Sequence, residues 1–196
     1  MLEAMRQLLL PDSDFTFSFL EPYRMSLPAY ERLCLANQDL RIERNAEGEL
    51  RIMAPAGAES DHRNAALIAL LYAWAKHDGR GRAFGASTEF ILPDGSAYSP
   101  DAAWVSDAQL ARVPKARRRR FLRLAPEFIA EVMPPTDRLK TAQAKMQDWV
   151  RNGVQLGWLF DCDHQTVYVY RAGSAKPRKL SRGKKLAGEG PLAGFM

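Results

Sequence analysis

The sequence predicts an α/β fold of the α+β type, in which helices flank a mixed central β-sheet. Segments that alternate polar and apolar residues stand in pairs around short turns, as antiparallel hairpins do. An apolar segment at 127–133, a helical segment at 137–152 and an apolar segment at 154–160 follow one another, as in a strand–helix–strand crossover. A crossover needs parallel pairing and hairpins need antiparallel pairing, so both kinds are expected in one sheet.

The chain has 196 residues, which is enough for one well-buried core. We expect an N-terminal arm at 1–24, beginning with a short amphipathic helix, and a single domain at 25–196. No apolar run approaches the roughly 18 residues of a membrane span, so we expect a cytoplasmic protein without a membrane partner. Cys34 and Cys162 lie far apart without metal-ligand spacing, and we expect both to be reduced.

The first part of the domain is expected to hold a short helix, a hairpin and a long helix. Ser26 precedes a helical pattern with proline and glutamate in its first turn, which is typical of a helix start. Alternating segments at 39–44 and 49–53 predict a hairpin. Residues 58–78 carry leucines and a tryptophan at three- and four-residue spacing, and Gly79 supplies a stop, so a long helix is predicted.

The second part is expected to build most of the sheet. Strands at 82–92 and 96–105 are joined by an Asp-Gly turn and predict a second hairpin. A short helix is expected at 106–113. After the crossover, the strand at 154–160 and an alternating segment at 166–170 predict a third hairpin, which closes the sheet.

Positive charge is concentrated in two segments. The net charge is +5, and segments 112–123 and 171–185 each hold seven basic residues and no acid. The other 14 basic residues stand beside 23 acidic ones. This distribution suggests a polyanion-facing surface, although two solvated loops without a ligand would show the same pattern. The second segment is weakly patterned, and no strand is predicted there.

Two acids stand where apolar strands are expected. Glu131 lies in the middle of the apolar segment 127–133, and Asp101 opens another strand directly after Pro100. An ionisable side chain inside an apolar strand is costly unless it is paired or holds a metal. Two carboxylates brought together repel each other unless a cation lies between them, and hard oxygen ligands suit Mg²⁺ or Mn²⁺.

A lysine is placed to join these acids. On a helix, Lys145 borders an apolar stripe beside Trp149, so its stem can follow the core and its ammonium can reach the carboxylates. A metal and an ammonium beside a water are a means of cutting a phosphodiester, because they generate the nucleophile and neutralise the developing charge.

Each of these residues also has a structural interpretation that the sequence leaves open. Asp101 can be a turn-forming acid, Glu131 can form an ion pair with Arg138 or Lys140, and Lys145 can be a solvated helix residue. The occurrence of all three in order favours a site.

These motifs resemble the PD-(D/E)xK nuclease superfamily: Ser-Pro-Asp101 before an apolar strand, followed by Pro-Glu-Phe-Ile-Ala-Glu131-Val. More narrowly, residues 25 to 195 are similar to the Uma-two family of endonucleases, first catalogued as a domain of unknown function. The further matching motifs lie at 124–132, 137–138, Lys145 with Trp149, 152–154, 158–161, 166–171 and 186–195.

The resemblance implies a restriction-endonuclease-like fold and a set of site residues. It implies that Asp101 and Glu131 are catalytic and bind Mg²⁺ or Mn²⁺. In the superfamily pattern a lysine stands where this chain has Met133. The family is similar to a variant of that pattern in which the lysine comes from the following helix, which implies that Lys145 takes this role. Glu59 matches an acid that some members carry on the first core helix, which implies a further metal ligand.

The expected function is a metal-dependent endonuclease, a hydrolase of DNA phosphodiester bonds, acting as a homodimer without an organic cofactor. DNA is the expected partner, with phosphates contacted by Arg117, Arg118, Arg119 and Arg120. The alternative is a non-catalytic DNA-binding or assembly protein that keeps the fold, which Met133 motivates. A small-molecule α/β enzyme has less support, because the sequence has no glycine-rich phosphate loop, serine elbow or cofactor motif.

Overall fold

The structure is a computed structural model, and it describes residues 15–17, 24–53, 55–134 and 138–196. The chain forms two compact units, Met1–Pro55 and Ala56–Met196, which are described separately. Of the predicted arm at 1–24, only strand β1 (Phe15–Phe17) and Arg24 are described, so the expected first helix lies outside the described residues. The division into an arm and one domain stays a prediction.

The smaller unit confirms the predicted helix and first hairpin. It contains helix α1 (Leu27–Ala36) and strands β2 (Arg41–Arg44) and β3 (Leu50–Met53). Strand β3 pairs antiparallel with both β1 and β2. The buried Tyr30 joins the helix to the sheet, because its hydroxyl donates a hydrogen bond of 2.6 Å to the carbonyl oxygen of Ile42.

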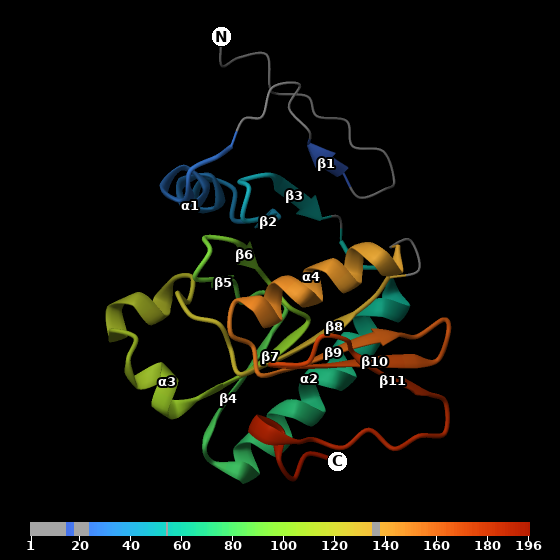
Figure 1. Ribbon diagram of the computed structural model, residues 1–196. Helices are drawn as coiled ribbons and strands as arrows, with labels where there is room; N and C mark the ends of the chain where they lie inside the picture. Colours follow the sequence, from blue (N-terminus) through green and yellow to red (C-terminus); the bar gives the residue numbers. More distant parts are fainter. Residues whose placement is uncertain (1–14, 18–23, 54, 135–137) are drawn as a thin grey trace. The chain divides into compact units, whose positions relative to one another are not determined.

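The larger unit is built on a six-stranded sheet in the order β11-β10-β9-β8-β7-β4 (Figure 1). Its strands are β4 (Gly81–Gly85), β7 (Ala102–Ser106), β8 (Phe128–Val132), β9 (Leu156–Asp161), β10 (Thr166–Arg171) and β11 (Arg178–Ser181). Neighbouring strands are antiparallel except β8 and β9, which are parallel and connected by helix α4 (Leu139–Arg151). The mixed sheet and its crossover are therefore confirmed.

Two helices cover opposite faces of this sheet, α4 on one and α2 (Ala58–Asp78) on the other (Figure 1). Strand β8 alternates between them as its pattern predicts. Ile129 belongs to a buried cluster with Met146 of α4, whereas Phe128 belongs to a second cluster with Leu71 of α2. Two apolar layers therefore enclose the middle of β8, and Glu131 points to the α4 side.

The predicted strands at 82–92 and 96–105 are not continuous, and this prediction was wrong. The first is broken after β4, where the Thr88 amide donates to the Gly85 carbonyl in a turn. The second is broken before β7, where Pro100 has no amide hydrogen to give to a neighbouring strand. Both breaks are set by local backbone chemistry that outweighs the favourable alternation on either side.

The four resulting strands separate into two pairs. Strands β4 and β7 pair antiparallel within the six-stranded sheet. Strands β5 (Phe90–Ile91) and β6 (Ala97–Tyr98) form a small hairpin around the predicted Asp94-Gly95 turn. The breaks therefore place the hairpin beside the sheet and not in line with it.

The last strand was not predicted. Strand β11 pairs antiparallel with β10, and its residues are exposed apart from the partly buried Leu180. A single apolar residue in a basic segment gives no alternating pattern. Beyond it, a short 3₁₀ helix η3 (Gly190–Leu192) leads to the buried Leu192 and Phe195, which join the cluster on the α2 face.

Cys34 and Cys162 are both reduced, as predicted. Within the described ranges, no helix combines the length and apolar character that crossing a bilayer requires.

Candidate active site

The two predicted acids come from neighbouring segments of the larger unit, since Glu131 lies in β8 and Asp101 directly precedes β7. Strands β7 and β8 pair antiparallel with Ala102 opposite Ala130. Asp101 directly precedes Ala102 and Glu131 directly follows Ala130, so the two acids lie at the same end of the β7–β8 pairing. The bend at Asp101 turns its side chain toward β8, where the Val132 amide donates a 2.7 Å hydrogen bond to Asp101 Oδ2.

The Asp101 carboxylate is buried and held at both oxygens. Only 8% of the residue is exposed. While Val132 binds Oδ2, the side-chain amide of Asn64 donates a 3.1 Å hydrogen bond to Oδ1. Asn64 comes from α2, on the far side of the sheet from α4. A carboxylate with a donor at each oxygen has a defined orientation, and the role of Asp101 stays a prediction.

Glu131 is held from the opposite side, by helix α4. Lys145 Nζ lies 2.9 Å from Glu131 Oε1, and the indole nitrogen of Trp149 donates a 3.1 Å hydrogen bond to the same oxygen. The side chains of Lys145 and Glu131 are 17% and 13% exposed. The interpretation of Lys145 as a solvated helix residue is therefore wrong. Glu131 was expected to pair with Arg138 or Lys140 if its role were structural, and the structure shows an ion pair with Lys145.

A tyrosine completes the surroundings of the ammonium. Lys145 Nζ lies 5.5 Å from the centre of the Tyr98 ring, within the range of a cation–π interaction. The Tyr98 hydroxyl donates a 3.3 Å hydrogen bond to Asp148 Oδ2, and its ring packs 5.5 Å from that of Trp149. Lys145 thus lies between a carboxylate and an aromatic face.

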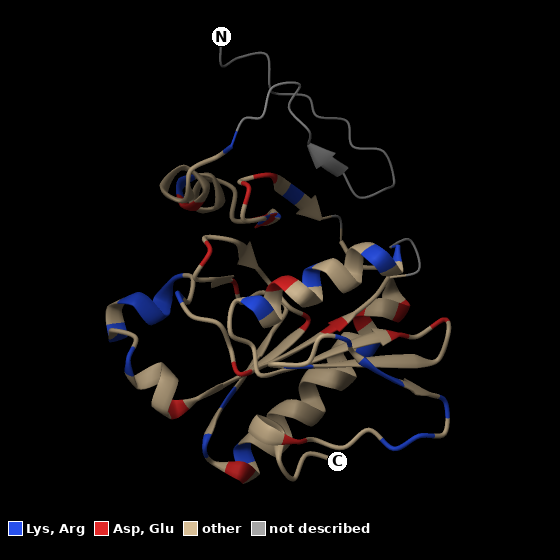
Figure 2. Ribbon diagram, in the orientation of Figure 1, with Lys and Arg blue, Asp and Glu red and all other residues tan. Residues whose placement is uncertain are grey.

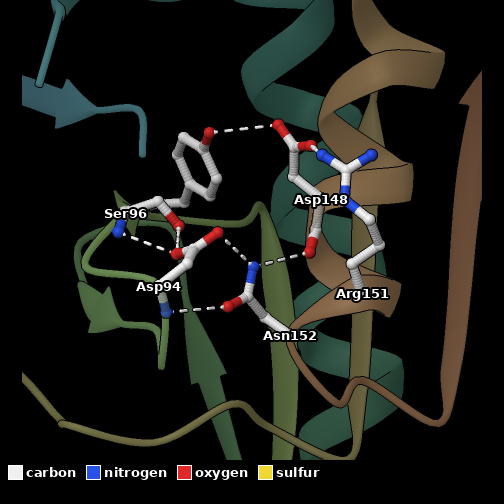
Figure 3. Close-up of polar contacts among 6 residues, drawn as sticks. Asp94, Ser96, Asp148, Arg151 and Asn152 are labelled. Carbon is white, nitrogen blue, oxygen red and sulfur yellow. Dashed lines mark hydrogen bonds and ion pairs between the residues drawn. The ribbon is translucent and has the colours of Figure 1, made fainter. Parts of the chain in front are cut away.

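The hairpin that carries Tyr98 is tied to the end of α4 by a polar network (Figure 3). Asn152 accepts a 3.1 Å hydrogen bond from the Asp94 amide and donates one of 2.8 Å to Asp94 Oδ2. Asn152 also donates to the Asp148 carbonyl at 2.9 Å, and Arg151 pairs with the Asp148 carboxylate. Within the hairpin, Ser96 donates to Asp94 from both its amide and its hydroxyl.

These donors change the acidity of Asp94. Burial acts to raise the pKa of Asp94, but hydrogen bonds from Ser96 and Asn152 and the charge of Arg151 together outweigh it. The pKa of this carboxyl is consequently below its usual range. Its ionised form is favoured in the folded state, so the network depends on the Asp94 charge.

Replacing Asp94 with asparagine is expected to destabilise the fold in a pH-dependent way. Because folding lowers the pKa of Asp94, its contribution is present above the unfolded value of about 3.9 and is lost as pH falls through the folded value. The free energy of unfolding at pH 7 should fall by about 1 kcal/mol, a modest value because Asp94 is exposed to solvent. Urea unfolding at pH 7 and near pH 3 measures the effect; an equal difference at both pH values would contradict it.

The predicted DNA-binding arginines lie near one edge of the sheet. They follow helix α3 (Asp107–Ala111), which begins where β7 ends, and fall within or beside the 3₁₀ helix η2 (Lys115–Arg119). Arg117, Arg119 and Arg120 are exposed. Arg118 is half-buried, and its Nε donates a 2.9 Å hydrogen bond to the carbonyl of Val113.

Figure 2 shows this basic segment and the second one, which follows β10, on opposite sides of the larger unit. The strand order explains this arrangement, because β11 is one edge of the sheet and β4, beside α3, is the other. Strands β7 and β8, with the two acids, lie between the basic segments.

A family model matches most of this chain. The family model for Uma2, described as "Putative restriction endonuclease", matches residues 27–195. The chain belongs to the Uma2 family. No curated protein matches it.

A solved structure shows the same fold. This Uma2 chain is similar to the crystal structure of a "putative nuclease belonging to DUF820" from Anabaena variabilis ATCC 29413. The two chains are 19% identical, with a TM-score of 0.73, over 88% of this chain and 93% of the other. At this identity the likeness establishes the fold, a mixed sheet flanked by helices, and leaves the chemistry to the residues of the site.

The remaining predicted metal ligand of this Uma2 chain, Glu59, is exposed in the first turn of α2. It stands five residues before Asn64, which is about 140° around the helix at 100° per residue. Asn64, and not Glu59, is the residue of α2 with a described contact to Asp101. A metal role for Glu59 stays a prediction.

Three residues that contact Asp101, Glu131 or Lys145 were not predicted to do so. Asn64 lies in a helix whose visible pattern was its leucines, and Tyr98 lies in a strand where an aromatic residue is ordinary. Trp149 is fully buried, and its indole nitrogen also donates a hydrogen bond to Glu131. The sequence carried one indication of such a contact. Glu131 faces the apolar stripe of α4, and a carboxylate in apolar surroundings needs a buried hydrogen-bond donor.

Proposed function

We propose that this protein is a metal-dependent endonuclease that hydrolyses DNA phosphodiester bonds. In this proposal Asp101 and Glu131 bind Mg²⁺ or Mn²⁺, and Lys145 assists the attacking water. The observation that carries the proposal is the 2.9 Å pair between Lys145 and Glu131, with Asp101 hydrogen-bonded to the amide of Val132, the next residue of the same strand. Membership of a family described as a restriction endonuclease supports DNA as the substrate.

The acids fit a small hard cation. Mg²⁺ is usually held by one or two carboxylates together with waters and substrate phosphates, and not by an all-protein cage. Among the residues that the structure describes, no three His, Cys, Asp or Glu side chains gather into such a cage. Asp101 and Glu131 are each oriented by two protein donors, and Asn64 brings a buried amide oxygen, Oδ1, beside Asp101.

A bound cation would lower the pKa of a water and neutralise charge on the phosphate. The chain supplies orientation and positive charge. An ammonium carries three N–H donors, so Lys145 can hold Glu131 and orient the attacking water or a phosphate oxygen at the same time. Its low exposure strengthens these interactions, because little water competes for the donors. Asn64 and Trp149 keep the two carboxylates in place while substrate enters.

The central experiment is nicking of supercoiled plasmid in Mn²⁺ by the wild type, Asp101→Asn and Glu131→Gln, with an Asp101→Ala plus Glu131→Ala double variant. The single variants keep side-chain shape and remove one charge each, and should lower the rate by about 10² to 10³ or more. Asp163→Asn is the matched control, since it removes one exposed acid from the β9–β10 turn. Equal nicking by the wild type and the double alanine variant would refute the proposal.

Calorimetry separates this proposal from its rival, a non-catalytic DNA-binding or assembly protein. A Mn²⁺ binding signal that disappears in Glu131→Gln supports the nuclease. Salt-sensitive DNA binding without a metal signal supports the rival, for which the Lys145–Glu131 pair would be only a structural ion pair.

We propose that the exposed arginines of the first basic segment contact DNA phosphates. We also propose that the protein is a homodimer, which light scattering would test. Each phosphate contact adds about 0.9 to the slope of log K against log salt. Combined replacement of Arg117, Arg119 and Arg120 by alanine should therefore lower the slope by about 2 to 3. Arg118 is left in place because its bond to Val113 supports the loop.

The control for this measurement is a triple alanine variant of Arg182, Lys184 and Lys185 in the second basic segment, also exposed. It removes the same charge from the opposite side of the unit (Figure 2). An unchanged slope in the arginine variant would contradict phosphate contacts by this segment. Equal losses in both variants would mean that net charge, and not these arginines, sets the affinity.

A further inference from the structure

The small hairpin β5–β6 contacts helix α4 beside the candidate active site. It lies outside the six-stranded sheet and carries none of the three proposed catalytic residues. It nevertheless contributes Tyr98, a residue only 6% exposed, which contacts three residues of helix α4. Of these three, Lys145 and Trp149 lie about one turn apart and both contact Glu131, and Asp148 directly precedes Trp149.

The orientation of the Tyr98 ring is determined by its neighbours. The hydroxyl donates to Asp148 Oδ2 at 3.3 Å, which fixes the far end of the side chain. The ring packs against Trp149 at 5.5 Å and an interplanar angle of 57°, which limits its rotation. A ring held at its edge and its tip presents a constant aromatic face to the ammonium 5.5 Å away.

The hairpin itself is attached to the same helix. Asp94 in its turn exchanges hydrogen bonds with Asn152 just beyond α4, and Asn152 binds back to the Asp148 carbonyl (Figure 3). Tyr98 and Lys145 therefore keep their separation as long as this attachment holds. The aromatic face and the lysine are parts of one local framework.

We infer that Tyr98 is a positioning residue that holds the Lys145 ammonium at Glu131. A lysine side chain has four rotatable bonds, and an ion pair with a carboxylate does not by itself select one rotamer. An aromatic face on a second side of the ammonium favours the rotamer that meets Glu131 and disfavours those directed to solvent. The catalytic consequence rests on the proposed nuclease function, whereas the positioning itself does not.

The first test measures the position of Lys145 without any assay of activity. The protein is treated with a limiting amine-acetylating reagent, and peptide mass spectrometry gives the acetylation rate of each lysine. Tyr98→Leu should raise the rate at Lys145 about threefold or more, while Tyr98→Phe, which keeps the aromatic face, should stay within about twofold. Lys140, exposed on the same helix, is the internal reference and should not change.

A shape-matched pair covers the case in which Tyr98→Leu does not fold. Phenylalanine and pentafluorophenylalanine at position 98 have nearly the same shape, but fluorination reverses the charge distribution of the ring face. Faster acetylation of Lys145 in the fluorinated protein than in Tyr98→Phe supports the inference. Equal rates in this pair, or an unchanged rate in a folded Tyr98→Leu, would overturn it.

The second test asks whether the position matters for cleavage. In Mn²⁺, Tyr98→Leu should lower kcat about tenfold or more and leave KM for plasmid within about twofold, because Lys145 acts on the reacting groups and not on DNA affinity. Tyr98→Phe should restore most of kcat. A proportional change in KM, or an unchanged kcat with faster acetylation, would show that the contact has no catalytic role. If the wild type does not cleave, the nuclease proposal fails and the acetylation result alone decides the role of Tyr98.

Discussion

Replacing Lys145 with methionine is expected to reduce DNA cleavage by about two to four orders of magnitude and to strengthen Mn²⁺ binding at the same time. Methionine fills most of the space of the lysine stem but carries no charge. Cleavage falls because the attacking water loses its donor. Cation affinity rises because the ammonium, 2.9 Å from Glu131 Oε1, no longer neutralises the carboxylate that is proposed to bind the metal.

The opposite signs of the two effects make this prediction specific. A lysine that only stabilised the fold would lower both cleavage and metal binding as the protein lost structure. Lys140→Met is the matched control, since it removes the same charge from an exposed position of the same helix and should change both quantities by less than about twofold. Plasmid nicking and Mn²⁺ calorimetry on the same preparations give the two readings. Weaker Mn²⁺ binding in a folded Lys145→Met protein would contradict the proposed role.

Replacing Trp149 with alanine is expected to lower the free energy of unfolding by about 3 to 5 kcal/mol. The indole is fully buried and packs against the rings of Phe90 and Tyr98, so its removal leaves a cavity between α4 and the β5–β6 hairpin. It also removes the hydrogen-bond donor to Oε1 of Glu131, whose side chain is only 13% exposed. The loss therefore combines apolar burial with an unpaired hydrogen bond at a carboxylate.

Urea unfolding followed by far-ultraviolet circular dichroism measures this loss. Trp149→Phe separates its two parts, because phenylalanine keeps most of the apolar volume and lacks the indole N–H; we expect about 1 to 3 kcal/mol. Tyr72→Ala is the control, since this aromatic side chain of α2 is 57% exposed and its loss should cost less than about 0.5 kcal/mol. Similar losses for Trp149→Ala and Tyr72→Ala would mean that the cluster beneath α4 does not support the fold.

Elements with a complete local signal were predicted closely. Helix α2 spans 58–78 as expected, because its leucines and tryptophan recur at three- and four-residue spacing from Leu67 to Trp74 and Gly79 adopts the left-handed conformation, with φ of 72°, that ends a helix. The crossover through α4 was also predictable, since two apolar strands separated by one helix have few ways to pair.

Elements that depend on a distant partner were predicted poorly. The strands expected at 82–92 and 96–105 each belong partly to the sheet and partly to the hairpin, and alternation continues on both sides of the breaks. Strand β11 exists because β10 offers an open edge, and its own residues carry only one apolar side chain. The alternating pattern decides neither outcome: the breaks follow from the turn between Gly85 and Thr88 and from Pro100, and β11 follows from its pairing with β10.

The sequence by itself determined which groups could carry the chemistry: an acid after Pro100, an acid inside an apolar strand, and a lysine at the border of the apolar stripe of α4. These are properties of spacing along one strand or one helix, and the pairing of Lys145 with Glu131 agrees with them. The tertiary structure alone decided which groups orient them. Asn64, Tyr98 and the indole nitrogen of Trp149 reach the site from a helix, a hairpin and a buried ring. Whether a donor reaches a carboxylate depends on the distances between helices and strands, and the residue pattern within one helix or strand does not predict those distances.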